Sequence, residues 1–205
     1  MFSTTFSSGL FIIFIGYLIG SLPSGYLAGR WIAGIDIRKT GSGSTGATNV
    51  LRQVGKVPAL IVFVLDVSKG TISILIAKHL GVNDYFEVAT GIAALGGHIW
   101  PIWLNWKGGK AVATGLGVLL GISWSVGAAS LGIFLTILTF SKIVSLSSVT
   151  SALTLPFLIL IKFQGDNFRM AYLIVGILAS AMVLWRHREN IRRLKNNTEP
   201  RIGKS

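Results

Sequence analysis

Two glycine-rich stretches hold the residues best suited to binding phosphate. The first, TGSGSTGATN over Thr40–Asn49, combines three glycines with hydroxyl and amide side chains and is followed by Arg52. The second, WKGGKAVATG, places Lys110 directly after two glycines. Glycine-rich turns let backbone N–H groups approach an anion, and Arg or Lys adds positive charge. Both stretches predict phosphate binding, with an ordinary polar turn as the alternative for the first.

The first stretch also fits the dinucleotide motif G-x-G-x-x-G through Gly41, Gly43 and Gly46. Such a site needs a preceding strand, a following helix and an acid about 20 residues later. Asp66 has that spacing, but it lies in ALIVFVLDVSKGTISILIA, which reads as a membrane helix. The chain also lacks an alternating strand and helix pattern, so the sequence argues against a dinucleotide site.

Two more polar clusters occur later in the chain. KIVSLSSVTS contains Ser145 and Ser148 at the start of an apolar run, where the hydroxyls either cap a helix or face a ligand. WRHRENIRRL contains His187 and Asn190 among arginines, and the usual role of a basic segment next to a membrane is to attract lipid head groups. These clusters are candidates for a second part of the same site.

The composition predicts that these residues are positioned by membrane helices. Of 205 residues, 51% are hydrophobic and 13% are charged, and there is no cysteine. The absence of cysteine excludes disulfides, thiolate metal sites and cysteine nucleophiles. Since a spanning helix needs about 20 apolar residues, we expect an all-α integral membrane protein of about seven spans. The candidate spans are Ser8–Gly29, Val57–His79, Val88–Asn105, Lys110–Ile122, Ser125–Phe140, Val144–Phe163 and Phe168–Trp185.

The basic residues predict the orientation of these spans. Most of the 19 lysines and arginines fall on one side if the amino terminus lies outside and the carboxyl terminus in the cytoplasm. That arrangement places all four polar clusters on the cytoplasmic side. The charges are spread over several loops, which argues against a nucleic-acid partner. We expect one membrane-embedded domain over residues 1–205, with residues 196–205 as a loose cytoplasmic tail.

Two charged pairs lie within or beside the spans, and structural rather than catalytic roles are expected for both. Asp66 and Lys69 are three residues apart, so they share a helix face and are expected to pair. His79 and Asp84 have the H-x-x-x-x-D spacing of an acyltransferase acid–base pair. The expected topology places that pair opposite every phosphate-like cluster, which argues against catalysis by it.

Several long motifs together resemble one family, the bacterial acyl-phosphate:glycerol-3-phosphate acyltransferases of the PlsY type. The motifs are GYLIGSLPSGYLAGR, DIRKTGSGSTGATNVLRQVGK, LDVSKG, GHIWPIWLNWKGGKAVATGLGV, SLSSVTS and WRHRENIRRL, and they run through nearly the whole chain. Two departures are visible. Ser44 and Thr45 stand where members often have Asn and Ile or Val, and Ala111 replaces a common Gly.

The resemblance implies transfer of a fatty acyl group from acyl phosphate to the 1-hydroxyl of glycerol 3-phosphate. The products are lysophosphatidate and phosphate, the first step of phospholipid synthesis. The resemblance further implies a multi-pass protein of the bacterial cytoplasmic (inner) membrane, in contact with membrane lipid, with its active site facing the cytoplasm. It implies no cofactor, no metal, no acyl-CoA and no obligatory protein partner.

The same resemblance implies roles for individual residues. Acyl phosphate would be bound by Ser42, Gly43, Gly46, Thr48, Asn49, Gly108, Gly109 and Lys110. Glycerol 3-phosphate would be bound by Arg52, Lys110, Ser145, Ser148, His187 and Asn190. Lys110, His187 and Asn190 would act catalytically by orientation and electrostatics. The proton acceptor is either His187 or the phosphate of the donor, and the arginines beside His187 favour the phosphate.

Two functions of other classes remain as alternatives. An anion or phosphorylated-metabolite transporter would also use a basic, glycine-broken site, but such sites usually lie near the midplane between inverted repeats, and no repeat is detectable. A phosphotransferase that uses a metal would need a group of acids, and the cytoplasmic side has few.

Overall fold

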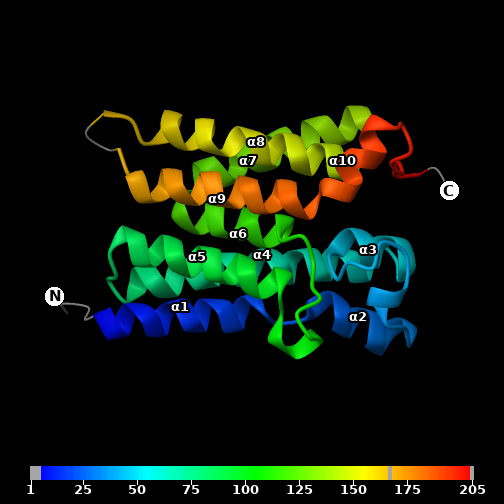
Figure 1. The fold of residues 1–205 in the computed structure, drawn as a ribbon, viewed down its shortest axis with the longest axis horizontal. Coiled ribbons are helices and arrows are strands. Elements are labelled where there is room, and N and C mark those ends of the chain that lie inside the picture. The colour runs from blue at the N-terminus through cyan, green and yellow to red at the C-terminus, as the bar shows by residue number, and fades with distance from the viewer. Residues whose placement is uncertain (1–5, 166–167, 204–205) are drawn as a thin grey trace. The chain divides into compact units, whose positions relative to one another are not determined.

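The structure is a computed structural model that describes residues 6–165 and 168–203, and all of its regular structure there is helical (Figure 1). The described residues form two compact units that divide after Ile122. The first unit contains α1 (Phe6–Gly20), α2 (Ser24–Ala33), η1 (Ile37–Lys39), α3 (Ala47–Gln53), α4 (Lys56–His79), α5 (Asp84–Ile99), η2 (Ile102–Leu104) and α6 (Val112–Ile122). The second contains α7 (Trp124–Ser141), α8 (Val144–Lys162), α9 (Met170–Arg186) and α10 (Arg188–Lys195).

Each of the seven apolar segments expected from the sequence contains a helix. By length and composition, four described segments are able to cross a membrane: Phe6–Ala33, α4, α7 and α8. The pair α9 and α10, bent by 63°, makes a fifth if it is counted as one span. The helix α5, with 16 residues, and α6, with 11, are shorter. The all-helical prediction is confirmed, and the number seven stays a prediction.

The first expected span is broken near its middle. Helix α1 ends at Gly20 and α2 begins at Ser24, immediately after Pro23. Proline has no N–H to donate and disfavours helical backbone in the residue before it, so the hydrogen-bond ladder stops there. The break places Ser21 and Ser24 within a cluster of polar side chains rather than on a continuous helix.

Helices α4 and α6 of the first unit pack by close backbone approach. A Cβ on Gly70 would overlap the Thr114 carbonyl oxygen, and a Cβ on Gly117 would overlap the Val67 carbonyl oxygen. The Thr71 hydroxyl donates to the Gly117 carbonyl at 3.0 Å across the same interface. Small residues and hydroxyl bonds are typical of helix pairs in membranes, where burial of apolar surface adds little.

The expected ion pair within α4 is confirmed. The Lys69 ammonium lies 2.6 Å from Asp66 Oδ1, and both side chains are buried. The Ser24 hydroxyl donates to the same oxygen at 2.6 Å, which joins α2 to α4. The second carboxylate oxygen, Oδ2, is buried without a hydrogen-bond partner in the part of the chain that the structure describes. Lys69 is the nearest cation to this carboxylate, and His98 Nδ1 lies 3.7 Å from the same Oδ1.

Hydroxyl bonds also join the helices of the second unit. The Ser151 hydroxyl of α8 donates to the Ser130 carbonyl of α7 at 2.9 Å. On the next helix, α9, the Ser180 hydroxyl donates to the Ala152 carbonyl at 2.5 Å. These contacts hold α8 between its neighbours, and the amino-terminal turn of α8 carries the serines predicted to bind substrate.

Candidate active site

The loop from Thr40 to Gly46 is organised around Asn49, a side chain that is 1% exposed. Its amide nitrogen shares its two N–H donors among three backbone carbonyls, those of Ile37 and Thr40 at 3.1 Å and that of Ser44 at 2.9 Å. Its amide oxygen accepts from the Ser42 N–H at 3.1 Å. Both the nitrogen and the oxygen of the Asn49 amide are thus hydrogen-bonded to nearby backbone groups, so Asn49 stabilises the conformation of the loop.

The other predicted phosphate ligands of this loop lie closer to its surface. Ser42 and Gly43 are exposed, and Gly46 and Thr48 are half-buried where α3 begins. Arg52 is exposed near the end of α3. The surface of this segment therefore carries backbone, hydroxyl and cationic groups, and the buried Asn49 side chain holds its interior in place.

The second glycine-rich stretch packs backbone to backbone on the end of α5. Gly108 and Gly109 donate their N–H groups to the carbonyls of Ile99 and His98, at 3.1 and 3.0 Å. A Cβ on Gly108 would overlap the His98 carbonyl oxygen, and a Cβ on Gly109 would overlap the His98 ring. The position of Lys110 therefore depends on both residues being glycine.

The backbone between Lys110 and α6 is left-handed. The sequence predicts a helix starting at Lys110, whereas α6 begins at Val112 and Ala111 has a φ of 59°. That conformation costs an L-residue with a side chain about 1–2 kcal/mol. It explains why relatives are expected to carry Gly where this chain has Ala.

We expect Gly109→Ala to lower sharply the acyl transfer that the family resemblance implies, because the added methyl group must displace the His98 ring or the loop that carries Lys110. A misplacement of about 1 Å can cost about 100-fold in rate. The measurement is kcat/KM of the purified variant with acyl phosphate and glycerol 3-phosphate. Gly96→Ala is the matched control, since a Cβ there meets nothing within 4 Å. Equal activity of the two variants would contradict the prediction.

Arg38 connects the two glycine-rich stretches. Its guanidinium makes a two-pronged pair with Asp36, with bonds of 2.9 and 2.7 Å, and donates a third bond to the Leu104 carbonyl at 3.1 Å. It also lies 4.9 Å from the centre of the Tyr26 ring. Through these contacts η1, which leads into the first stretch, is fixed to η2, which leads into the second.

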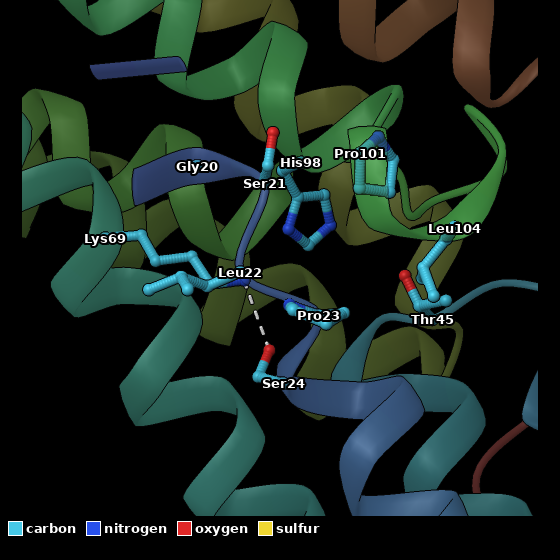
Figure 2. Close-up of a pocket in the computed structure, with 10 residues that line it drawn as sticks. All are labelled: Gly20, Ser21, Leu22, Pro23, Ser24, Thr45, Lys69, His98, Pro101 and Leu104. Atoms are coloured by element: carbon cyan, nitrogen blue, oxygen red, sulfur yellow. Dashed lines mark hydrogen bonds between the residues drawn. The ribbon is translucent and has the colours of Figure 1, made fainter. Parts of the chain in front are cut away.

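A small pocket lies beside both stretches in the first unit (Figure 2). It is lined by Gly20, Ser21, Leu22, Pro23, Ser24, Thr45, Lys69, His98, Pro101 and Leu104. Thr45 belongs to the first stretch, and His98 and Pro101 contact the glycines of the second. The Lys69 ammonium donates to Ser24 Oγ at 3.2 Å at its edge. The pocket thus joins the α1–α2 break to both candidate phosphate elements.

The remaining predicted residues lie together in the second unit. Ser145 and Ser148 are buried in the first turn of α8, and His187 and Asn190 are buried around the junction of α9 and α10. The serines do not cap α8, because the Ser148 hydroxyl donates to the Val144 carbonyl at 2.9 Å and Ser145 bonds elsewhere. The capping alternative is therefore wrong for these hydroxyls.

The imidazole of His187 has a defined proton position. Its Nδ1 lies 2.8 Å from the Val183 carbonyl oxygen. A carbonyl only accepts hydrogen bonds, so Nδ1 carries the proton and, in the neutral ring, Nε2 carries the lone pair. His187 is then chemically able to accept a proton at Nε2.

The carboxylate of Glu199 joins this group of side chains. Its Oε1 accepts from Asn190 Nδ2 at 2.6 Å and from the Ser145 hydroxyl at 2.7 Å, and its Oε2 accepts from Arg193 Nε at 2.7 Å. The Ile202 N–H also donates to the Lys142 carbonyl at 2.7 Å. These contacts tie residues 199–202 to α8 and α10, where the sequence predicts a loose polar tail.

The chain matches the family model "Glycerol-3-phosphate acyltransferase" over residues 10–197. This chain belongs to the glycerol-3-phosphate acyltransferase family. Relatives carrying the same name are 65% identical over 93% of this chain and 92% of their own in Prochlorococcus marinus strain MIT 9211, and 63% identical over the full length of both in strain MIT 9313. A relative in Synechococcus sp. strain CC9902 is 61% identical over 96% of both chains.

Two solved structures resemble this acyltransferase. Both are crystal structures of PlsY (YgiH), an integral membrane glycerol 3-phosphate acyltransferase, and each match covers 96% of both chains. The glycerol 3-phosphate form has a TM-score of 0.89 at 38% identity, and the lysophosphatidic acid form has 0.86 at 37%. The chain is accordingly an all-helical integral membrane acyltransferase.

The acyltransferase chain holds its predicted ligands in two separate groups. The proposed acyl-phosphate ligands and Arg52 belong to the first unit, and Ser145, Ser148, His187 and Asn190 belong to the second. In the first unit Arg38 and the pocket connect the two glycine-rich stretches, and in the second unit Glu199 connects Ser145 to Asn190. That the two groups complete a single site stays a prediction.

The sequence did not indicate which residues hold the candidate ligands in position through hydrogen bonds and packing. Asp36 and Arg38 were detectable, because an acid two residues before an arginine at a turn often pairs with it. For His98, near Pro101, the sequence allows either a core histidine or a residue that lines the site and favours the first, whereas the structure places it in the pocket lining. For Glu199 the sequence indicates only a position in a loose tail. The partners of Glu199 are 6 to 54 positions away, so no local pattern marks it.

The pair His79 and Asp84 lies away from the first glycine-rich stretch of the same unit. His79 ends α4 and Asp84 begins α5, and this turn lies at the end of the first unit opposite α3 (Figure 1). Helix α4 has 24 residues, which at about 1.5 Å each separates its two ends by tens of ångströms. The acid–base interpretation of this pair has no support in the first unit.

The Asp36–Arg38 pair predicts a pH dependence of stability. The bonds that Arg38 donates lower the pKa of Asp36 from 3.8 to about 2. A depressed pKa contributes stability that is complete above the unfolded value and is lost as pH falls through the folded value. We expect the difference in melting temperature between wild type and Asp36→Asn to be constant above about pH 5 and to shrink between about pH 4 and pH 2. A difference independent of pH would rule out the charge of Asp36 as the cause.

Proposed function

We infer that this protein transfers a fatty acyl group from acyl phosphate to the 1-hydroxyl of glycerol 3-phosphate. The hydroxyl oxygen forms the new ester bond to the acyl carbon, the bond from that carbon to the phosphate oxygen breaks, and the phosphate leaves with the proton. The products are 1-acylglycerol 3-phosphate, a lysophosphatidate, and inorganic phosphate. The observation that carries this inference is the match along nearly the whole chain to relatives and structures of this family.

Acyl phosphate is assigned to the first unit. The donor is already activated, so the protein must orient it, stabilise the developing oxyanion and neutralise the leaving phosphate. The exposed groups of the first stretch, Ser42, Gly43, Gly46 and Thr48, would hold the phosphate, with Asn49 maintaining the loop. Gly108 and Gly109 would place Lys110 where its positive charge faces both the phosphate and the carbonyl oxygen.

Glycerol 3-phosphate is assigned to Arg52, Lys110, Ser145, Ser148, His187 and Asn190. The cations suit the phosphate, and the buried hydroxyl, amide and imidazole groups suit the glycerol hydroxyls. The lone pair on His187 Nε2 is one acceptor for the hydroxyl proton. The phosphate of the donor is the other, and it is favoured because Arg186 and Arg188 next to His187 oppose a positive charge on the ring.

The membrane arrangement that fits this function has about seven spans, with the amino terminus outside and the carboxyl terminus in the cytoplasm. The excess of Lys and Arg in the loops that carry the four polar clusters supports this orientation. It places the site at the cytoplasmic face of the bacterial inner membrane, where soluble glycerol 3-phosphate reaches it directly. An acyl chain would approach from the lipid.

The test is product formation by the purified protein in detergent or liposomes. Radiolabelled glycerol 3-phosphate is supplied with palmitoyl phosphate or with palmitoyl-CoA, and labelled lysophosphatidate is separated and counted. We expect product with palmitoyl phosphate and little or none with palmitoyl-CoA. Product formation only with palmitoyl-CoA would reject the donor, and uptake of label into liposomes without lysophosphatidate would favour a transporter.

A further inference from the structure

The carboxylate of Glu199 is built into the second unit as a buried acceptor of three hydrogen bonds. Its side chain is 4% exposed. The donors come from two elements: Ser145 from the start of α8, and Asn190 and Arg193 from α10, at 2.6 to 2.7 Å. A carboxylate held by several donors, one of them charged, is among the strongest hydrogen-bonded groups in proteins.

The partners of this carboxylate favour its ionised form, since Arg193 pairs with it and Asn190 and Ser145 donate hydrogen bonds to it. Burial alone would raise the pKa of Glu199, but the hydrogen bonds from Asn190, Ser145 and Arg193 outweigh burial and lower the pKa below its ordinary value. An ionised carboxylate only accepts hydrogen bonds. The direction of every bond to it is therefore fixed, and the proton lies on the partner each time.

The fixed direction determines what Ser145 and Asn190 can offer to a ligand. The single hydroxyl proton of Ser145 is committed to Glu199, so toward any other group its oxygen presents lone pairs. The amide nitrogen of Asn190 faces Glu199, which orients the amide oxygen of the same side chain away from it. Ser145 is thus set as an acceptor, and Asn190 has its amide oxygen oriented away from Glu199 while its second N–H stays a donor. An acceptor oxygen matches a hydroxyl rather than a phosphate.

We propose that Glu199 is a positioning residue that makes Ser145 and Asn190 specific for the glycerol hydroxyls of the acceptor substrate. The proposal rests on the proposed function, in which these two residues contact glycerol 3-phosphate. It divides the recognition of that substrate: cationic side chains bind the phosphate, and the side-chain oxygens of Ser145 and Asn190, oriented by Glu199, recognise the hydroxyl-bearing end. The role is distinct from catalysis, because Glu199 acts through its two neighbours.

The tail geometry supports this role. The Thr198 N–H donates to the Arg193 carbonyl at 2.9 Å, and the Ile202 N–H donates to the Lys142 carbonyl at 2.7 Å. Glu199 therefore lies between two backbone anchors, one on α10 and one just before α8. A side chain held on both sides loses little entropy when it fixes its neighbours.

The experiment compares two acceptors, glycerol 3-phosphate and 3-hydroxypropyl phosphate, which keeps the phosphate and the acylated hydroxyl but lacks the middle hydroxyl. The measured quantity is the ratio of their kcat/KM values with palmitoyl phosphate as donor. We expect wild type to prefer glycerol 3-phosphate by on the order of 10- to 100-fold, the value of a hydroxyl bonded to committed polar groups. Glu199→Ala is expected to bring this ratio close to one.

Two variants serve as controls. Glu189→Gln removes another carboxylate of α10, one that is exposed and paired with Arg192 at 2.9 Å, and should keep the wild-type ratio. Glu199→Gln keeps the size of the side chain and a weaker acceptor, and should lower the ratio by a smaller factor than Glu199→Ala.

The outcomes separate this inference from the proposed function. If wild type forms no lysophosphatidate, the proposed function fails and the positioning role fails with it. If wild type is active but Glu199→Ala loses activity equally for both acceptors, Glu199 only supports the fold and the inference is wrong. A lower KM for glycerol 3-phosphate in Glu199→Ala would also overturn it, since the carboxylate would then compete with the substrate phosphate. Should Glu199→Ala not fold, an unchanged ratio in Glu199→Gln contradicts the proposal and a lowered ratio supports it.

Discussion

Replacing Lys110 with alanine is expected to lower kcat/KM for acyl transfer by about 100- to 1000-fold, the usual cost of removing one charged group that stabilises a transition state. Lys110 follows two glycines that are bonded to the end of α5, so its backbone position is fixed. The variant loses the ammonium group without disturbing those glycines. The measurement is initial rates with palmitoyl phosphate and labelled glycerol 3-phosphate at several concentrations of each.

Lys107→Ala is the matched control for this effect. Lys107 lies three positions earlier in the same loop and is exposed. Its removal changes the net charge of the loop by the same amount, so it should leave kcat/KM near the wild-type value. Full activity of Lys110→Ala, or an equal loss in both variants, would show that Lys110 has no specific role and would reject the assigned site.

Replacing Lys69 with methionine is expected to give the largest loss of stability, about 3–5 kcal/mol, because it leaves a buried carboxylate without its counter-ion. Asp66 is 1% exposed and one of its oxygens already lacks a hydrogen-bond partner among the described residues. The loss is measured as the change in unfolding free energy in mixed micelles. The same change at exposed Lys56, at the start of the same helix, should be nearly neutral.

The double variant Asp66→Asn, Lys69→Met separates charge from packing. If the uncompensated carboxylate causes the loss, removing it as well should recover most of the stability. A double variant that is as unstable as Lys69→Met alone would show that the lysine chain is needed for packing. Acyl transfer by the double variant then reports whether this pair, at the edge of the pocket below the first glycine-rich stretch, contributes more than stability.

Apolar runs and their flanking charges predicted the helical fold well. The expected Val57–His79 and Val144–Phe163 correspond to α4 (Lys56–His79) and α8 (Val144–Lys162). Hydropathy is a local property, and a membrane helix bonds its own backbone, so local sequence is sufficient there. Hydropathy did not predict the break before Ser24. Pro23 is present there, but the apolar composition of the segment indicated one continuous helix.

The site was only partly predictable for a different reason. Glycine, lysine and hydroxyl groups in short runs indicated phosphate binding without reference to the fold. The polar contacts that orient them are made between residues far apart in the chain, as between Arg38 and the Leu104 carbonyl or Ser145 and Glu199. A single sequence contains each member of such a pair but no sign that they meet. Asn49 shows a second limit of prediction from sequence. An asparagine in a glycine-rich loop indicated a phosphate ligand, but its side-chain hydrogen bonds are made to the backbone of the protein itself.

The close approach of α4 and α6 constrains how this protein can change over evolutionary time. At Gly70 and Gly117 every possible substitution adds atoms, and each neighbour that a Cβ would overlap is a backbone atom. A smaller residue on the facing helix cannot relieve this overlap, because the overlapping atoms belong to the backbone. Leu60 and Val64 on the outward side of α4, 63% and 52% exposed, carry no such restriction. We therefore expect sequence differences among relatives to accumulate on the lipid-facing surface of these helices. Almost no substitutions are expected at Gly70 and Gly117, where α4 and α6 are in contact.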